Sequence, residues 1–249
     1  MMHNFTKIRL SLFIILLGNI SIVYGQDLQT HISDKLWEAI GGKDNWQHAR
    51  YFMFSCIGGP DDSFTQGKRT YLWDKQEGHC RFEGITTDDE SIIALFNLKT
   101  HTGSVYINGE KLSNPKTSSD VINEVSDEFE RDASLLFLPT TIEGGSGSFM
   151  VTGEKLIGSR RFTVVDIKNN KTSFDAAVDG QLFVDAQTGR IQQWLPHPGK
   201  NKFAVSGFKD IGSGLILPTQ FTASDTSHSI TYTLAAALVN IESQKFNTP

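Results

Sequence analysis

The sequence predicts a mainly β protein, a half-open antiparallel β-barrel of about ten to twelve strands with two helices packed in or over its concave face. Short apolar runs recur along most of the chain, and turn residues such as Gly, Asp and Asn separate them. Long segments with amphipathic helical spacing are rare by comparison. A sheet of so many consecutive strands must coil on itself, which gives it a concave side.

The N-terminus has the pattern of a secretory signal peptide, which we expect to occupy residues 1–25. Lys7 and Arg9 precede an apolar run from Leu10 to Ile22, and Gly25 ends a segment that fits a cleavage site before Gln26. The run has about 13 residues, fewer than the roughly 20 that a bilayer span needs, so a retained membrane anchor is the less favoured alternative. The mature chain, 26–249, is expected to be one exported domain, soluble in the periplasm or secreted.

The charge of the chain argues against nucleic acid as a partner. The formal net charge is −5, and removal of Lys7 and Arg9 with the signal peptide would bring it to about −7. Phosphate binding needs clustered basic residues, whereas the densest basic pieces here, 159–161 and 200–202, are short and separate.

The mature chain opens with an amphipathic helix. Its apolar residues have four-residue spacing, and Gly41-Gly42 ends it; these residues are Leu28, Ile32, Leu36 and Ile40. One more helical turn is expected from Lys43 to Trp46, with the Trp46 indole buried.

Residues 49–112 are predicted to be strands joined by tight turns. The expected strands cover 49–57, 67–73, 79–84, 91–99 and 103–112. Asn108-Gly109 is the strongest hairpin signal in the chain, because both residues tolerate positive φ. The turns that begin at Asp74 and Asp185 share the spacing Asp-x3-Gly, which a common turn chemistry explains.

The two cysteines, Cys56 and Cys80, leave two arrangements open. A disulfide is the first consideration in an exported chain. If the first three strands form a meander, however, the cysteines lie on its outer strands, about 9.5 Å apart. That exceeds the roughly 7 Å between Cα atoms that a disulfide tolerates, so separate thiols are favoured.

A second amphipathic helix is expected from Asp120, after a polar loop at 113–119, to the region of Pro139. Val125, Phe129 and Leu136 fall on its apolar face and Glu128 on its polar face. A Gly-rich linker at 144–147 then leads back to strands. The predicted strands are 148–153, 155–158, 160–167, 172–179, 181–186 and 229–242. The stretch 182–221 is expected to form one continuous wall of the coiled sheet.

No set of residues in the sequence indicates a reaction. We therefore expect the protein not to be an enzyme and to have no catalytic residue, cofactor or metal. The segment from Glu143 to Ser148 lacks the final Gly of a nucleophile elbow and the Gly-Lys of a phosphate loop. The histidines are scattered, with no His-x3-His and no CxxC pair. A hydrolase site assembled only in space is the third and least favoured hypothesis.

The order of several short motifs resembles the LolA/LolB-like outer-membrane lipoprotein-sorting proteins, in particular the divergent versions in Bacteroidota-type bacteria. The motifs, at 41–46, 71–74, 137–139, 182–185 with Gly189, and 214–218, span most of the mature chain. The resemblance implies a single LolA-like β domain over 26–249, an open barrel with helices as a lid over an apolar cavity. It also implies a periplasmic location and non-covalent carriage of acyl chains.

We therefore expect a non-enzymatic carrier or sensor that binds a hydrophobic small molecule, lipid or lipoprotein acyl chain in the concavity of the sheet. The ligand-binding candidates alternate along strands or lie on the apolar helix stripe: Phe54, Leu72, Phe82, Phe96, Phe129, Leu136, Phe183 and Trp194. The alternative is a structural or interaction module of the cell envelope, with a filled core and an edge strand for a protein partner.

Overall fold

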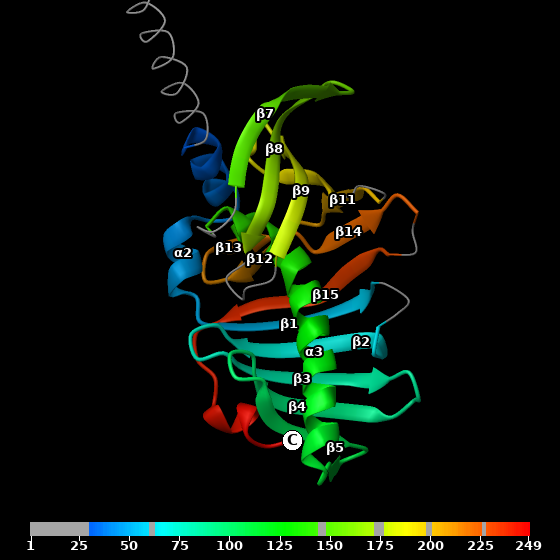
Figure 1. The fold of residues 1–249 in the computed structure, drawn as a ribbon. Helices are drawn as coiled ribbons and strands as arrows, with labels where there is room; N and C mark the ends of the chain where they lie inside the picture. The colour runs from blue at the N-terminus through cyan, green and yellow to red at the C-terminus, as the bar shows by residue number, and fades with distance from the viewer. Residues whose placement is uncertain (1–29, 60–62, 144–147, 172–176, 198–200, 226–227) are drawn as a thin grey trace, which may run out of the picture.

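The computed structural model describes residues 30–249 apart from 60–62, 144–147, 172–176, 198–200 and 226–227. Its main feature is one open antiparallel sheet of 13 strands, accompanied by a separate two-stranded sheet and by helices (Figure 1). The predicted mainly β class, with an open sheet and helices on its concave face, is confirmed. The predicted linker at 144–147 lies outside the described residues.

The large sheet consists of two meanders. The first contains β1 (Tyr51–Gly58), β2 (Thr65–Asp74), β3 (His79–Thr86), β4 (Ser91–Asn97), β5 (Thr102–Ile107) and β6 (Glu110–Lys111). The second contains β7 (Ser148–Ile157), β8 (Arg160–Lys171), β9 (Ala177–Asp185), β10 (Ile191–Leu195), β11 (Phe203–Ser206), β14 (Gln220–Ala223) and β15 (Ile230–Leu238). β15 pairs with β1 and joins the two, which leaves β6 and β7 as the two edges.

Helix α3 (Pro115–Leu136) crosses the face of this sheet because of the topology. The chain leaves the sheet at edge β6 and re-enters it at the opposite edge β7, so the connection must pass over one face. At 1.5 Å per residue, the 22 residues of α3 span about 33 Å, and η1 (Leu138–Glu143) completes the crossing. Figure 1 shows α3 lying across β15 and the strands of the first meander.

The start of α3 differs from the predicted one at Asp120. Asn114 caps the helix, since its side-chain oxygen accepts from the backbone N–H groups of Lys116 and Thr117, and Pro115 occupies the first helical position. Both are standard start signals. The expected polar loop at 113–119 is therefore mostly the first turns of the helix.

The N-terminal helix, residues 30–39, lies beside the second meander (Figure 1), and α2 (Lys43–His48) reaches the first, where Trp46 packs on Phe52 of β1 with ring centroids 5.3 Å apart. As predicted, Gly41 ends the first helix and Trp46 is buried. Gly41 has φ 100°, and a Cβ there would lie 1.8 Å from the carbonyl oxygen of Gly214. This close approach brings β12 (Lys209–Gly212) and β13 (Leu215–Leu217) against the helix, where the Ile216 N–H donates to the Ile40 carbonyl at 2.9 Å.

Two predicted strand arrangements differ from the structure. The expected strands 148–153 and 155–158 form the single strand β7, because a register shift between Val151 and Gly153 accommodates Gly153 without ending the pairing with β8. The stretch 182–221 is not one wall, since β12 and β13 pair only with each other and leave the large sheet. Part of the expected strand 172–179 lies outside the described residues.

The predicted turns are confirmed in detail. Asn108 and Gly109 have φ of 50° and 83° and join β5 to β6. In the turn at Asp74, the carboxylate accepts from the backbone N–H groups two and three residues on, and Gly78 N–H donates to the Asp74 carbonyl. The turn at Asp185 repeats every one of these bonds. The shared chemistry explains the shared spacing.

The Asp185 turn gives an expectation for acid stability. Burial by itself would raise the pKa of the Asp185 carboxyl, but hydrogen bonds from the Thr188 and Gln187 N–H groups outweigh burial and lower it. The unfolded chain therefore binds this proton more readily than the folded chain, so stability falls as the pH drops below about 4. In Asp185→Asn, urea unfolding between pH 2 and 5 should show a flatter loss of stability than in the wild type.

A matched variant separates the charge from the hydrogen bonds. Asp185→Asn retains a side-chain acceptor, so its stability at pH 7 should stay within about 1 kcal/mol of the wild type. Asp185→Ala removes the acceptor and should be less stable across the whole pH range. If the free energy of unfolding falls with decreasing pH equally steeply in the wild type and in Asp185→Asn, the acid sensitivity does not come from this carboxylate.

The cysteines are separate thiols. Cys56 on β1 and Cys80 on β3 are both buried and free, with β2 between their strands, as the meander predicted. Among the described residues, no helix is long and apolar enough to cross a membrane.

Candidate functional site

The concave face between α3 and the first meander is filled by aromatic side chains. Phe54 stacks on Tyr71 with ring centroids 4.8 Å apart, and Phe129 of α3 lies 5.6 Å from Tyr71 and 5.5 Å from Trp73. Five of the predicted ligand-binding residues are in this core and at most 4% exposed: Phe54, Phe82, Phe96, Phe129 and Leu136. The structure brings these five together as packing between helix and sheet.

The other three candidates lie elsewhere. Leu72 points away from α3, because its neighbours Tyr71 and Trp73 face the core and side chains alternate along a strand. Phe183 likewise lies between two core residues of β9 and faces away from α3, where the Lys155 ammonium is 5.5 Å from its ring centroid. Trp194 lines a cavity on the concave side, and none of the other seven belongs to the described wall of that cavity.

A buried ionic cluster ties α3 to the filled half of the sheet. The Asp132 carboxylate, 0% exposed, accepts from Arg69 Nε at 2.6 Å and Nη2 at 3.0 Å, from the Tyr71 hydroxyl at 2.7 Å and from Cys56 Sγ at 3.1 Å. The Tyr232 hydroxyl donates to the Asp132 carbonyl. The charge of Asp132 is thus compensated by a bidentate arginine and two further donors, which is how a buried carboxylate is tolerated.

The cluster also sets the protonation of its members. Burial, reinforced by the negative charge of Asp132, raises the pKa of the Cys56 thiol and of the Tyr71 hydroxyl well above their ordinary values. Burial opposes the charge of Arg69, but its hydrogen bonds to Asp132 outweigh burial and raise the guanidinium pKa. Cys56 is therefore a protonated donor at neutral pH, and a thiol in that state is a poor nucleophile.

A second bond network anchors the same helix nearer its middle. Glu128 is 2% exposed, and its carboxylate accepts from the Thr65 backbone N–H at 2.9 Å and from the Thr65 hydroxyl at 2.6 Å. The prediction that Glu128 lies on the solvated face of the helix is wrong, because β2 extends two residues before Gly67 and covers it.

The concave cavity, as we name it, lies between the C-terminal turns of α3 and residues of β9, β10, β11 and β15. Its volume is about 450 Å³, and its wall consists of Gly59, Arg131, Asp132, Ser134, Leu135, Val178, Asp179, Trp194, Pro196, His197, Phe203, His228 and Ile230. This volume falls in the range of roughly 300–1,000 Å³ typical of ligand pockets.

Trp194 forms the centre of the apolar wall. Its ring stacks on Phe203, with centroids 5.4 Å apart at 23°, and its Nε1–H donates to the Asp179 carbonyl at 3.2 Å. A Cβ on Gly180 would approach the Trp194 Nε1 to 2.9 Å, so the glycine allows the indole to lie over β9. At the rim, His197 Nε2 lies 3.1 Å from an Asp166 oxygen and His228 Nδ1 lies 3.5 Å from Asp225.

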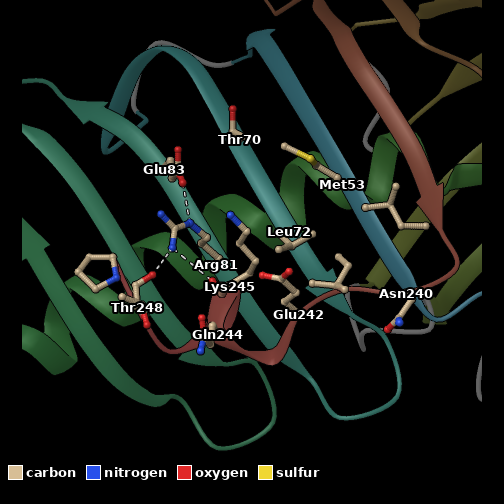
Figure 2. A pocket seen from close by; sticks show the side chains of 13 residues that line it. Met53, Thr70, Leu72, Arg81, Glu83, Asn240, Glu242, Gln244, Lys245 and Thr248 are labelled. Carbon is tan, nitrogen blue, oxygen red and sulfur yellow. Dashed lines mark hydrogen bonds and ion pairs between the residues drawn. The ribbon is translucent and has the colours of Figure 1, made fainter.

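The convex cavity, as we name the second one, lies on the opposite face of the sheet, with a volume of about 670 Å³. Met53, Leu72 and Leu238 form its floor, and the C-terminal segment from Asn240 to Pro249, which contains η2 (Ser243–Phe246), covers it. Figure 2 shows Arg81 beside Glu83, with dashed bonds to the backbone carbonyls of Lys245 and Thr248. The C-terminal segment therefore forms one wall of the convex cavity, and Arg81 of β3 holds that segment in place.

Several residues of the concave cavity were not predicted from the sequence. Arg131 and Leu135 are one helical turn apart, and Asp132 falls on the apolar stripe with Val125, Phe129 and Leu136. A carboxylate on an apolar stripe is a signal of a buried ion pair and could have located the cluster. Val178, Phe203 and Ile230 belong to three separate strands, and nothing in their spacing indicates a shared cavity.

No three His, Cys, Asp or Glu side chains are arranged to hold a metal ion in the part of the chain that the structure describes. The cavity walls offer burial, hydrogen bonding and charge, which are the means of binding a ligand.

The comparisons with known proteins give likeness of fold. No protein-family model matches the chain, and no curated protein matches it. Among solved structures, it is similar to a DUF1329 family protein from Desulfovibrio piger (10% identity, TM-score 0.44, covering 87% of this chain and 96% of that one). It is also similar to the LolA superfamily protein NE2245 from Nitrosomonas europaea (12% identity, TM-score 0.39, covering 83% and 97%). The second of these is a LolA superfamily protein, the group whose short motifs the sequence resembles.

Proposed function

We propose that the protein is a non-enzymatic carrier or sensor of a hydrophobic ligand, such as a lipid or a lipoprotein acyl chain, bound in the concave cavity. The observation that carries the proposal is an unfilled space of about 450 Å³ with an apolar wall, next to a half of the same face that is completely packed. Burial of an alkyl chain against this wall would contribute about 0.8 kcal/mol per CH₂ group. No chemistry is required of the protein.

The proposal includes the compartment and the domain. We propose that residues 1–25 are removed as a signal peptide and that 26–249 act as one domain in the periplasm or outside the cell. Mass spectrometry of the protein purified from its native envelope should give a chain that begins at Gln26. The same preparation, extracted with solvent, should release the bound small molecule.

The direct test is a titration of delipidated protein with a fluorescent fatty acid. We expect saturable binding of one ligand per chain at micromolar protein, reversed by an unlabelled fatty acid. Absence of binding by protein with native circular dichroism and a cooperative thermal transition would remove the carrier proposal.

An interaction module of the cell envelope is the second candidate, and one observation favours it. Edge strand β7 carries Met150 and Leu156 at 50% and 69% exposure, and an exposed edge can accept a strand from a partner. If the protein is an interaction module, the wild type should capture an envelope protein and should not bind fatty acid. Leu156→Lys should then abolish the capture. Fatty acid binding that survives Leu156→Lys favours the carrier.

A further inference from the structure

The side chain of Arg131 marks one end of the concave cavity. It is 32% exposed, projects from α3 one turn before Leu135, and belongs to the cavity wall. Its Nε is buried, and no hydrogen-bond acceptor contacts it among the described residues. A buried donor in this state calls for an acceptor, because a donor removed from water without a partner keeps the full cost of its desolvation.

The protein groups around Arg131 satisfy it only in part. Its Nη2 donates to the Ser63 hydroxyl at 3.1 Å and lies 3.6 Å from Glu128 Oε1, while its Nε is 4.0 Å from Asp132 Oδ1. Both carboxylates have shorter bonds elsewhere, Glu128 to Thr65 and Asp132 to Arg69. A guanidinium has five N–H donors, so Arg131 keeps capacity for one more oxyanion.

Apolar side chains make up a large part of the rest of the wall, beside the polar residues Asp132, Ser134, Asp179, His197 and His228. Leu135, Val178, Phe203 and Ile230 are each at most 9% exposed, and Trp194 lies among them. One cationic end and a long apolar wall match an amphiphile with an anionic head. The head belongs at Arg131, because the neighbouring wall carboxylate of Asp132 is already paired with Arg69.

We propose that the ligand of the concave cavity is a single-chain amphiphile whose carboxylate or phosphate oxyanion is bound by Arg131, with its alkyl chain along Trp194 and Phe203. This rests on the proposed function and specifies its ligand class. Charge-assisted bonds to a guanidinium are roughly twice as strong as neutral ones, so the anionic amphiphile should bind about tenfold or more tightly than the alcohol of equal chain length.

The test is competition against N-phenyl-1-naphthylamine, a neutral fluorescent probe, with hexadecanoic acid, hexadecyl phosphate and hexadecanol. We expect the wild type to prefer the two anions over the alcohol about tenfold. In Arg131→Gln the preference should fall to near one while the affinity for the neutral probe is retained. Arg131→Lys should keep part of the preference, and Arg161→Gln, which removes an exposed arginine from β8, should keep all of it.

The outcomes separate the two proposals. If neither the probe nor any amphiphile binds folded wild-type protein, the proposed function fails. If all three amphiphiles bind equally well, or if Arg131→Gln keeps the preference, the function stands and the assignment to Arg131 is overturned. A preference for the phosphate over the carboxylate would indicate a phospholipid-type head, and the reverse a free fatty acid.

Discussion

Replacement of Asp132 by Ala is expected to lower the free energy of unfolding by about 3–5 kcal/mol, because it leaves the buried guanidinium of Arg69 without its counter-charge. Arg69 is 3% exposed on its side chain, and among the described residues it would retain only its bond to the Gly58 carbonyl, at 2.7 Å. The donors Tyr71 and Cys56 lose the same acceptor. Such a loss is a large share of the 5–15 kcal/mol that stabilises a typical domain, and urea unfolding at pH 7 measures it.

Two matched variants test the origin of this loss. Glu154→Gln breaks the exposed pair with Arg161, whose side chains are 59% and 68% exposed, and should cost less than about 1 kcal/mol. The double variant Arg69→Met with Asp132→Leu removes both buried charges and should be more stable than Asp132→Ala. If Asp132→Ala costs no more than Glu154→Gln, the ion pair does not hold α3 on the sheet.

Replacement of Ser134 by Trp is expected to reduce fatty acid affinity at least tenfold, which corresponds to about 1.4 kcal/mol, by filling the concave cavity. Ser134 is half-buried on α3 and lines the cavity, and its hydroxyl donates only to the Glu130 carbonyl of the preceding turn. A larger side chain can therefore enter the open space without displacing core residues. Fluorescence titration measures the affinity, and the melting temperature should change by only a few degrees.

The control for this variant uses the other cavity. Met53→Trp fills the convex cavity, on the opposite face of the sheet, and should leave fatty acid affinity within about twofold of the wild type. If Met53→Trp abolishes binding and Ser134→Trp does not, the ligand occupies the space beneath the C-terminal segment. In that case the Arg131 assignment fails together with the concave site.

Local chemistry in the sequence was a reliable guide to the elements themselves. Asn108-Gly109 and the two Asp-x3-Gly turns predicted their hairpins because turn geometry depends on a few adjacent residues. The start predicted for the second helix, at Asp120, is too late for a reason that is also local. Asn114-Pro115 is a start signal that apolar spacing alone does not reveal.

The candidate site was harder to predict than the fold. Alternation along strands separates two faces but does not tell a filled part of a face from an open one, so Phe54 and Phe129 in the packed core were ranked with Trp194 at the cavity. The wall of the concave cavity combines α3 with strands far away in the chain. One of its charged residues, Arg131, is next in the sequence to Asp132, whose carboxylate accepts from Arg69 in the buried cluster.

Turn chemistry and hydrophobic periodicity act over a few residues, and they suffice to predict a coiled antiparallel sheet with an amphipathic helix. Which part of that sheet is filled and which part is open follows from the packing of distant segments. The helix connects the two edges of a 13-stranded sheet, and the ion pair of Asp132 with Arg69 fixes it over the first meander. The volume beside Trp194 is the space that remains between two surfaces that are packed elsewhere. Its size depends on contacts between residues far apart in the chain.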